Sequence, residues 1–213
     1  MTTRALVVVG AGGHGREVAH AFLQNHPARD FLGFLDDVCS GSTPEGWPII
    51  GKVLDWTTWK HAEFVVGIND ARAKRSVVNT MKSLGDPTWG SVIHPTVSVQ
   101  ASVKTGYGVV ILGGVEVTVN VTIGAFASIN RLVALAHDCE LGDYTSIAPC
   151  ASISGNVTLC QGVEIGTGAC IREGVTLGTG SMIGMGSIVV KDVPANTLVV
   201  GNPAKPLREL EPW

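Results

Sequence analysis

One histidine in the second half of the chain stands beside an acid. His137 is followed directly by Asp138 in Ala136-His-Asp-Cys-Glu-Leu-Gly142, and no other histidine occurs after residue 97. Imidazole accepts a proton near neutral pH, and a carboxylate bound to its other nitrogen fixes the tautomer and raises its basicity. The pair therefore predicts a general base with an assisting acid. A histidine that is merely exposed at a turn is the alternative interpretation.

A glycine-rich loop near the start predicts phosphate binding. Gly10-Ala-Gly-Gly-His-Gly15 lies between an apolar run and a helical pattern, and Asp36 follows about 20 residues later, as in a dinucleotide fingerprint. A complete dinucleotide fold needs two βαβ halves, and the first 90 residues supply only one. We therefore expect a nucleotide diphosphate rather than a nicotinamide cofactor at the loop and the helix N-terminus. A loop that only connects a strand to a helix is the alternative.

The elements around this loop indicate a small parallel α/β domain over residues 1–90. Strands are expected at 4–9, 31–35 and 63–66, and helices at 16–23 and 71–84. The second strand ends in Asp36-Asp37 and the third in Gly67, and ligands bind at the carboxyl ends of such strands. Aspartate is also common in turns, which leaves a purely structural role open. Residues 47–60 are expected to form a loop with a short helix.

The second half carries a repeat of six residues. An aliphatic column recurs every sixth residue from Val99 to Val189, and a column of small or β-branched residues lies two positions before it. Glycines follow the aliphatic column at residues 106, 124, 142, 166, 178 and 184, where we expect corners with positive φ. Such units predict a parallel β-helix over residues 91–213, with about five coils if three units close one coil.

Composition excludes several classes of protein. The chain has 213 residues, 15% charged residues and a formal net charge of −3, so it lacks the basic surface of a nucleic-acid binder. Because no apolar run is long enough for a membrane span and the start does not resemble a signal peptide, we expect a cytoplasmic protein. Five cysteines without a C-x-x-C motif indicate neither a disulfide framework nor a zinc site.

Taken together, these motifs resemble a known family in order and spacing. The glycine loop, Phe34-Leu-Asp-Asp37, Gly67-Ile-Asn-Asp70, the sixfold repeat, the His137 motif and Val199-Val-Gly-Asn-Pro-Ala-Lys205 resemble the nucleotide-sugar acetyltransferases of the hexapeptide-repeat superfamily. The bacillosamine-type and perosamine-type N-acetyltransferases and the sialic acid O-acetyltransferases are the nearest comparison. The resemblance implies a left-handed parallel β-helix, a homotrimer, and an active site between subunits where acetyl-CoA meets a nucleotide-linked amino sugar, with no metal.

The resemblance also implies roles for individual residues. His137 is the catalytic base and Asp138 assists it. The contacts to the sugar nucleotide fall on Gly12, Gly13, His14, Asp36, Asp37 and Gly67. The contacts to acetyl-CoA fall on Ser146, Thr167 and Met185, although some relatives have histidine at the position of Ser146.

Other functions are compatible with the same sequence features. The same scaffold could O-acetylate a sugar, as in the sialic acid branch, or act as a non-catalytic module that binds a nucleotide sugar. A zinc hydratase of the γ-carbonic anhydrase kind needs three histidine ligands, whereas the repeats hold only His137.

Overall fold

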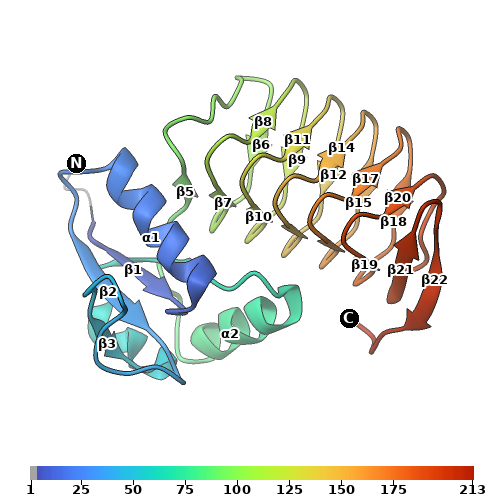
Figure 1. The fold of residues 1–213 in the computed structure, drawn as a ribbon. Coiled ribbons are helices and arrows are strands. Elements are labelled where there is room, and N and C mark those ends of the chain that lie inside the picture. The colour runs from blue at the N-terminus through green and yellow to red at the C-terminus, as the bar shows by residue number, and fades with distance from the viewer. Residues whose placement is uncertain (1–3) are drawn as a thin grey trace.

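The computed structural model of the chain describes residues 4–213. Residues 1–3, which belong to the predicted first domain, lie outside the described part. An α/β unit lies beside an elongated β-helix (Figure 1).

The α/β unit is built on a four-stranded parallel sheet in the order β3-β2-β1-β4. The strands are β1 (Leu6–Val9), β2 (Phe31–Leu35), β3 (Ile49–Gly51) and β4 (Glu63–Val66). The helices are α1 (Gly13–Asn25), the 3₁₀ helix η1 (Val53–Trp59) and α2 (Ala71–Ser83). The predicted strands and helices are confirmed. The expected loop at 47–60 is wrong in part, because β3 adds a strand at the sheet edge before the short helix.

The second half forms a triangular β-helix of three sheets, whose strands are parallel except for the last one, β22. The eight-stranded sheet contains β5 (Val92–Ile93), β7 (Val110–Ile111), β10 (Ser128–Ile129), β13 (Ser146–Ile147), β16 (Glu164–Ile165), β19 (Met182–Ile183), β21 (Thr197–Gly201) and β22 (Ala204–Glu209). The β8–β20 sheet contains β8 (Glu116–Val117), β11 (Ala134–Leu135), β14 (Ser152–Ile153), β17 (Cys170–Ile171) and β20 (Ile188–Val189). The β6–β18 sheet contains β6 (Lys104–Thr105), β9 (Thr122–Ile123), β12 (Glu140–Leu141), β15 (Thr158–Leu159) and β18 (Thr176–Leu177).

Each coil visits the three sheets in the same order and turns three corners. The first corner joins the eight-stranded sheet to the β8–β20 sheet, the second joins the β8–β20 sheet to the β6–β18 sheet, and the third returns to the eight-stranded sheet. Ser128 pairs with Ser146 in the next coil, an interval of 18 residues or three repeats. Both predicted columns fill the interior from Val109 onward, whereas Thr105 in the first coil is exposed. The β-helix prediction is confirmed.

The expected reason for the recurrent glycines is wrong. Gly124 and its equivalents do not have positive φ, and the corner residues two positions later do, among them Gly108, Phe126, Tyr144 and Gly168. A Cβ on Gly124 would lie 2.5 Å from the backbone nitrogen of Asp143 in the next coil. These glycines are therefore required by the close approach of stacked backbones.

The α/β unit packs against the eight-stranded sheet and the third corner. Phe126 and Tyr144 from that corner form a buried cluster with Val78 of α2, and Trp89 and Trp213 pack against it. The last strands of the eight-stranded sheet form an antiparallel hairpin, in which β21 continues the stack and β22 lies outside it. Because β5 already pairs with β7, we propose to keep the domain boundary near residue 90.

Candidate active site

The His137–Asp138 pair lies on the second corner, between β11 and β12. His137 Nδ1 lies 2.8 Å from Asp138 Oδ2, and both side chains are exposed. Asn120, one coil earlier on the same corner, donates from Nδ2 to Asp138 Oδ1 at 2.6 Å. The hydrogen bond from Asn120, together with that from His137, holds the pKa of Asp138 below its usual value. The carboxylate is therefore ionised and is held in place from two sides.

This geometry decides which nitrogen of His137 is available. An ionised carboxylate only accepts hydrogen bonds, so Nδ1 carries the ring proton and Nε2 is left as an acceptor. Gly155, one coil later, lies against the ring, and a Cβ there would come within 2.7 Å of Nε2 and 2.4 Å of Cε1. The arrangement can take a proton from a nucleophile that reaches Nε2.

Asn120 and Gly155 were not predicted as site residues. Both come from neighbouring coils. Asn120 lies 18 residues before Asp138, and Gly155 lies 18 residues after His137. The coil period is the signal that could have identified them.

The glycine loop presents an open face and a packed face. Gly12 and Gly13 are exposed, and a Cβ on either would meet nothing within 4 Å. Gly12 is the N-cap of α1 and makes no side-chain cap, so the first N–H groups of the helix are available to an anion. Gly67 belongs to the packed face, because a Cβ there would lie 2.5 Å from the Cα of Gly15. Gly67 thus lets β4 lie directly behind the loop.

Asp36 and Asp37 make bonds to the backbone of their own chain. Asp36 Oδ2 accepts from Ala11 N at 2.7 Å, and its Oδ1 accepts from the N–H groups of Val38 and Cys39. Burial alone would raise the pKa of Asp36, but these N–H donors outweigh it and the pKa is lowered. Asp37 Oδ1 accepts from Val53 N at 2.9 Å. Asp36 therefore holds the glycine loop against the end of β2, and direct contacts of the two acids to a ligand stay predictions.

His14 lies in the first turn of α1, and its side chain is largely buried. Both ring nitrogens are buried and have no hydrogen-bond partner, and Glu17 Oε2 lies 3.9 Å from Nδ1. Burial, with a smaller effect of the charge on Lys74, lowers the pKa of His14 to about 4. The ring is neutral at physiological pH and has two unused hydrogen-bonding positions.

The predicted acetyl-CoA contacts lie away from His137 in the same chain. Thr167 and Met185 are exposed on the first corner, and Met185 is 78% exposed. Ser146 lies on β13 and is buried, and its Oγ accepts from Lys74 Nζ at 2.9 Å. Within one chain, these three residues therefore lie apart from His137, which is on the second corner.

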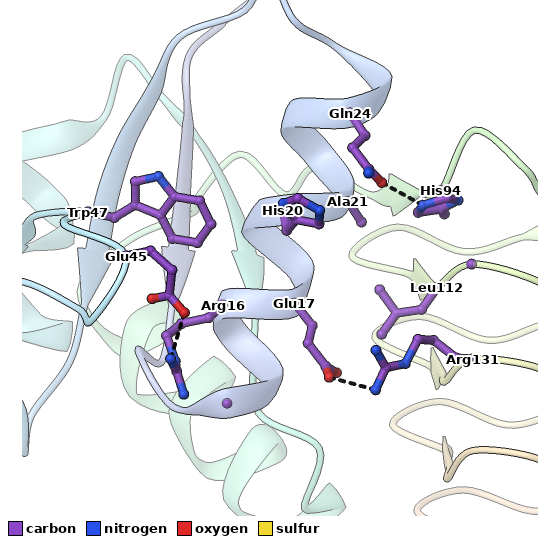
Figure 2. A pocket seen from close by; sticks show the side chains of 12 residues that line it. Arg16, Glu17, His20, Ala21, Gln24, Glu45, Trp47, His94, Leu112 and Arg131 are labelled. Atoms are coloured by element: carbon purple, nitrogen blue, oxygen red, sulfur yellow. Dashed lines mark hydrogen bonds and ion pairs between the residues drawn. The ribbon is translucent and has the colours of Figure 1, made fainter.

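A cavity of about 580 Å³ separates α1 from the first corner. Gly13 lines this cavity, and the pairs Arg16–Glu45 at 2.7 Å and Glu17–Arg131 at 2.9 Å border it. Figure 2 shows these pairs and the hydrogen bond between Gln24 and His94 on the other side of the cavity. The loop thus borders a cavity between the two parts of the chain, which is lined by apolar surface as well as by these charged pairs.

Within the part of the chain that the structure describes, no group of three or more histidine, cysteine or acidic side chains is arranged to hold a metal ion. Within residues 4–213, every helix is too short or too polar to cross a membrane.

Comparison with known proteins gives consistent matches over both halves. Residues 5–81 match the family model described as the PglD N-terminal domain. GDP-perosamine N-acetyltransferase of Escherichia coli O157:H7 is 32% identical over 158 residues, which cover 71% of this chain and 71% of that protein.

Solved structures match nearly the whole chain. The acetyltransferase domain of PglB from Neisseria gonorrhoeae FA1090, solved with acetyl coenzyme A, is 34% identical with a TM-score of 0.90 and covers 96% of this chain and 100% of that one. A variant of perosamine N-acetyltransferase from Caulobacter crescentus, in complex with CoA and GDP-perosamine, is 27% identical with a TM-score of 0.88, covering 96% and 97%. These matches confirm the predicted family and fold class.

Proposed function

Because the chain belongs to the acetyl-CoA-dependent nucleotide-sugar acetyltransferases of the hexapeptide-repeat β-helix superfamily, we propose that it acetylates the amino group of a nucleotide-linked amino sugar. A 4-amino-4,6-dideoxy sugar is the acceptor that we favour. The observation that carries the proposal is the exposed His137 with a free Nε2, fixed through Asp138 by Asn120. Both substrates are cytoplasmic metabolites, and we place the enzyme in that compartment.

The reaction needs one proton acceptor and no covalent enzyme intermediate. The sugar amine attacks the thioester carbonyl carbon of acetyl-CoA, and His137 Nε2 takes the proton that the nitrogen loses as the C–N bond forms. When the C–S bond breaks, the imidazolium returns this proton to the departing thiolate. Asp138 accepts from Nδ1 throughout and stabilises the positive charge of the intermediate imidazolium.

The α/β unit supplies the groups for the sugar nucleotide. The diphosphate binds the free N–H groups of Gly12, Gly13 and the first turn of α1, where the helix dipole favours negative charge. His14 offers a ring nitrogen that has no hydrogen-bond partner within the chain. Asp36 keeps the loop in this shape through Ala11, and we assign the nucleoside to the neighbourhood of Asp37, at the carboxyl end of β2.

We infer that a complete site combines two chains of a homotrimer. The glycine loop faces the eight-stranded sheet and the first corner, since Glu17 in α1 binds Arg131 on that corner. His137 lies on the second corner of its own chain. If a neighbouring chain packs its second corner against the first corner of this chain, the neighbour's His137 would lie beside the sugar. It would also lie beside Thr167 and Met185 of this chain. Ser146, which is buried, stays a predicted contact.

The test measures thiol release from acetyl-CoA with UDP-, dTDP- and GDP-linked 4-amino sugars. We expect turnover with at least one of them, and a decrease of kcat by about 10² to 10⁴ in His137→Ala, the usual contribution of a general base. Asp138→Ala should lose less, because it does not accept the substrate proton. His61→Ala, which removes an exposed histidine of the α/β unit, is the matched control and should behave as wild type.

The product separates the proposed reaction from its alternatives. Mass spectrometry should find one added acetyl group, and an amide resists hydroxylamine whereas an ester is cleaved. Cleavage would assign O-acetylation, and nucleotide-sugar binding without turnover would assign a binding module. A folded His137→Ala variant with normal kcat would place the base elsewhere.

A further inference from the structure

The segment that follows β22 returns to the α/β unit (Figure 1). It brings the indole of Trp213 against Arg75 and Arg72 of α2, whose guanidinium carbons lie 4.1 Å and 5.5 Å from the ring centroid. Arg72 also donates to the backbone oxygens of Glu211 and Pro212, to the latter at 2.9 Å. Two arginines one turn apart on α2 therefore hold this segment.

The same indole also lies on the third corner of the β-helix. Trp213 donates from Nε1 to Gln161 Oε1 at 3.1 Å, and from its backbone nitrogen to Asn196 Oδ1 at 2.9 Å. A Cβ on Gly162 would overlap the six-membered ring, and a Cβ on Gly180 would lie 2.9 Å from the Cβ of Trp213. Corner residues from three successive coils thus form the seat of one side chain, which joins the β-helix to α2.

The end of α2 that is held in this way is the end next to the glycine loop. Helix α2 begins at Ala71, four residues after Gly67, and Ala71 N donates to Glu164 Oε1 on β16 at 3.2 Å. Gly67 lies directly behind the loop, since a Cβ there would come within 2.5 Å of Gly15 Cα. Because closely packed backbones transmit small displacements, a change in the tilt of α2 would move the loop with it.

We propose that Arg72, Arg75 and Trp213, which we call the Trp213 clamp, are positioning residues that hold the glycine loop at the angle from which the sugar reaches the neighbour's His137. The inference rests on the proposed function, in which the sugar nucleotide binds the α/β unit and the base belongs to the β-helix. The reacting amine and the base are then held on separate parts, and the contacts that join these parts set their distance. A displacement of about 1 Å can lower the rate about a hundredfold.

A clamp that only adds stability would behave differently. The proposed nucleotide contacts all lie within the α/β unit, and the predicted acetyl-CoA contacts all lie on the β-helix. A looser joint between the two parts would therefore leave both binding affinities unchanged and would lower only the rate of acetyl transfer. A loss of stability alone would reduce the amount of folded enzyme and leave kcat per folded chain unchanged.

The experiment measures kcat and the acetyl-CoA KM of the whole protein with the UDP-, dTDP- or GDP-linked amino sugar that it turns over, and the Kd of the corresponding free nucleotide by calorimetry. Trp213→Ala should lower kcat about 10- to 100-fold and leave the acetyl-CoA KM and the nucleotide Kd within about twofold of wild type. Trp213→Phe keeps a ring beside Arg75 but loses the hydrogen bond to Gln161, and it should retain most of kcat.

Two further variants test whether the clamp acts as a unit. Arg75→Gln should also lower kcat, and adding it to Trp213→Ala should cost little more than Trp213→Ala alone, because the effects of two residues in one contact are not additive. Tyr107→Ala is the matched control. It removes an aromatic ring of the third corner that lies 5.7 Å from Lys82 Nζ, near the other end of α2, and it should keep the kcat of wild type.

Normal kcat in folded Trp213→Ala overturns the proposal, and so does an equal loss in Tyr107→Ala, because any contact along α2 would then have the same effect. A nucleotide Kd that rises as much as kcat falls also overturns it, since the α/β unit itself would then be altered. If Trp213→Ala does not fold, Arg75→Gln provides the same comparison. If wild type turns over none of the sugar nucleotides, the proposed function fails before the role of the clamp is reached.

Discussion

At the residue scale, the two histidines of the candidate site have opposite environments. His137 is exposed and bound to an ionised acid, whereas His14 is enclosed and has no hydrogen-bond partner. The first environment suits a residue that gains and loses a proton during catalysis. The second keeps imidazole neutral until a ligand provides a partner.

The buried His14 should make stability depend on pH. Its pKa is about 4 in the folded chain against 6.5 when unfolded, so the unfolded state binds the proton first as the pH falls. The free energy of unfolding should therefore decrease between pH 6.5 and pH 4, by about 3 kcal/mol if the full shift applies. Urea denaturation of wild type and His14→Gln at pH 7 and pH 4.5 measures this, and the variant should lose less stability. An equal loss in both would contradict the assignment, and His61→Gln serves as the exposed control.

Contacts between residues that are neighbours in the sequence could be predicted better than contacts between residues in different coils. His137 and Asp138 are neighbours, so their pairing could be predicted. Asn120 and Gly155 reach them from the coils on either side and carry no local signal. For Asp36 the strand end was predicted correctly, but its bonds to Ala11, Val38 and Cys39 depend on the path of two loops.

At the element scale, the coil has two kinds of special position. The corner residues have positive φ and include Asn120, Leu132 and Asp138, so this backbone shape does not require glycine. The positions equivalent to Gly124 have ordinary φ but touch the backbone of the next coil. The sequence showed the glycine column clearly, and only the stacked coils showed its cause. Strand β3 was missed because it has only three half-buried residues, directly follows Pro48 and ends in Gly51, a composition that is typical of a short edge strand.

These two kinds of position predict unequal effects of substitution. Gly124→Ala should destabilise the β-helix by about 3 kcal/mol, because the new Cβ meets backbone that cannot move without separating two coils. Gly174→Asn is the matched control: φ is +73° and nothing lies within 4 Å of a Cβ, so it should cost less than about 1 kcal/mol. Chemical denaturation gives both values. Equal costs would mean that the crowding at Gly124 is relieved elsewhere.

At the scale of the whole molecule, the contacts that fix the α/β unit to the β-helix are made by residues that do not recur periodically in the sequence. Lys74 binds Ser128 and Ser146, and Trp213 stacks under Arg75 at 4.1 Å while donating from Nε1 to Gln161 at 3.1 Å. Each half could be predicted from its own repeat or strand pattern. Their mutual packing could not, because it depends on single residues far apart in sequence.

A site shared between two chains should allow complementation. His137→Ala lacks the base but keeps the loop, and Gly13→Asp keeps the base but places a negative charge where the diphosphate binds; Gly13 has open space around it. Each variant alone should be inactive. In trimers formed from equal amounts of both, about a quarter of the sites combine an intact loop with an intact His137 from the neighbour. Co-expression followed by the thiol-release assay measures this fraction.

Recovery near zero in mixed trimers would place both parts of the site in one chain. Light scattering provides the control, since a monomer at the assay concentration would contradict the trimer itself.

The hairpin of β21 and β22 affects how one copy of the chain can associate with another copy. The last coil of a β-helix has unpaired backbone groups on its outer side, and stacking of further coils end to end would produce a polymer. Strand β22 turns antiparallel and ends the stack with an exposed edge that carries Lys205, Pro206 and Arg208. Proline lacks the donor that another strand needs, and the two cations repel an identical edge. The hairpin thus protects the chain against fibre formation while leaving the corners free for catalysis.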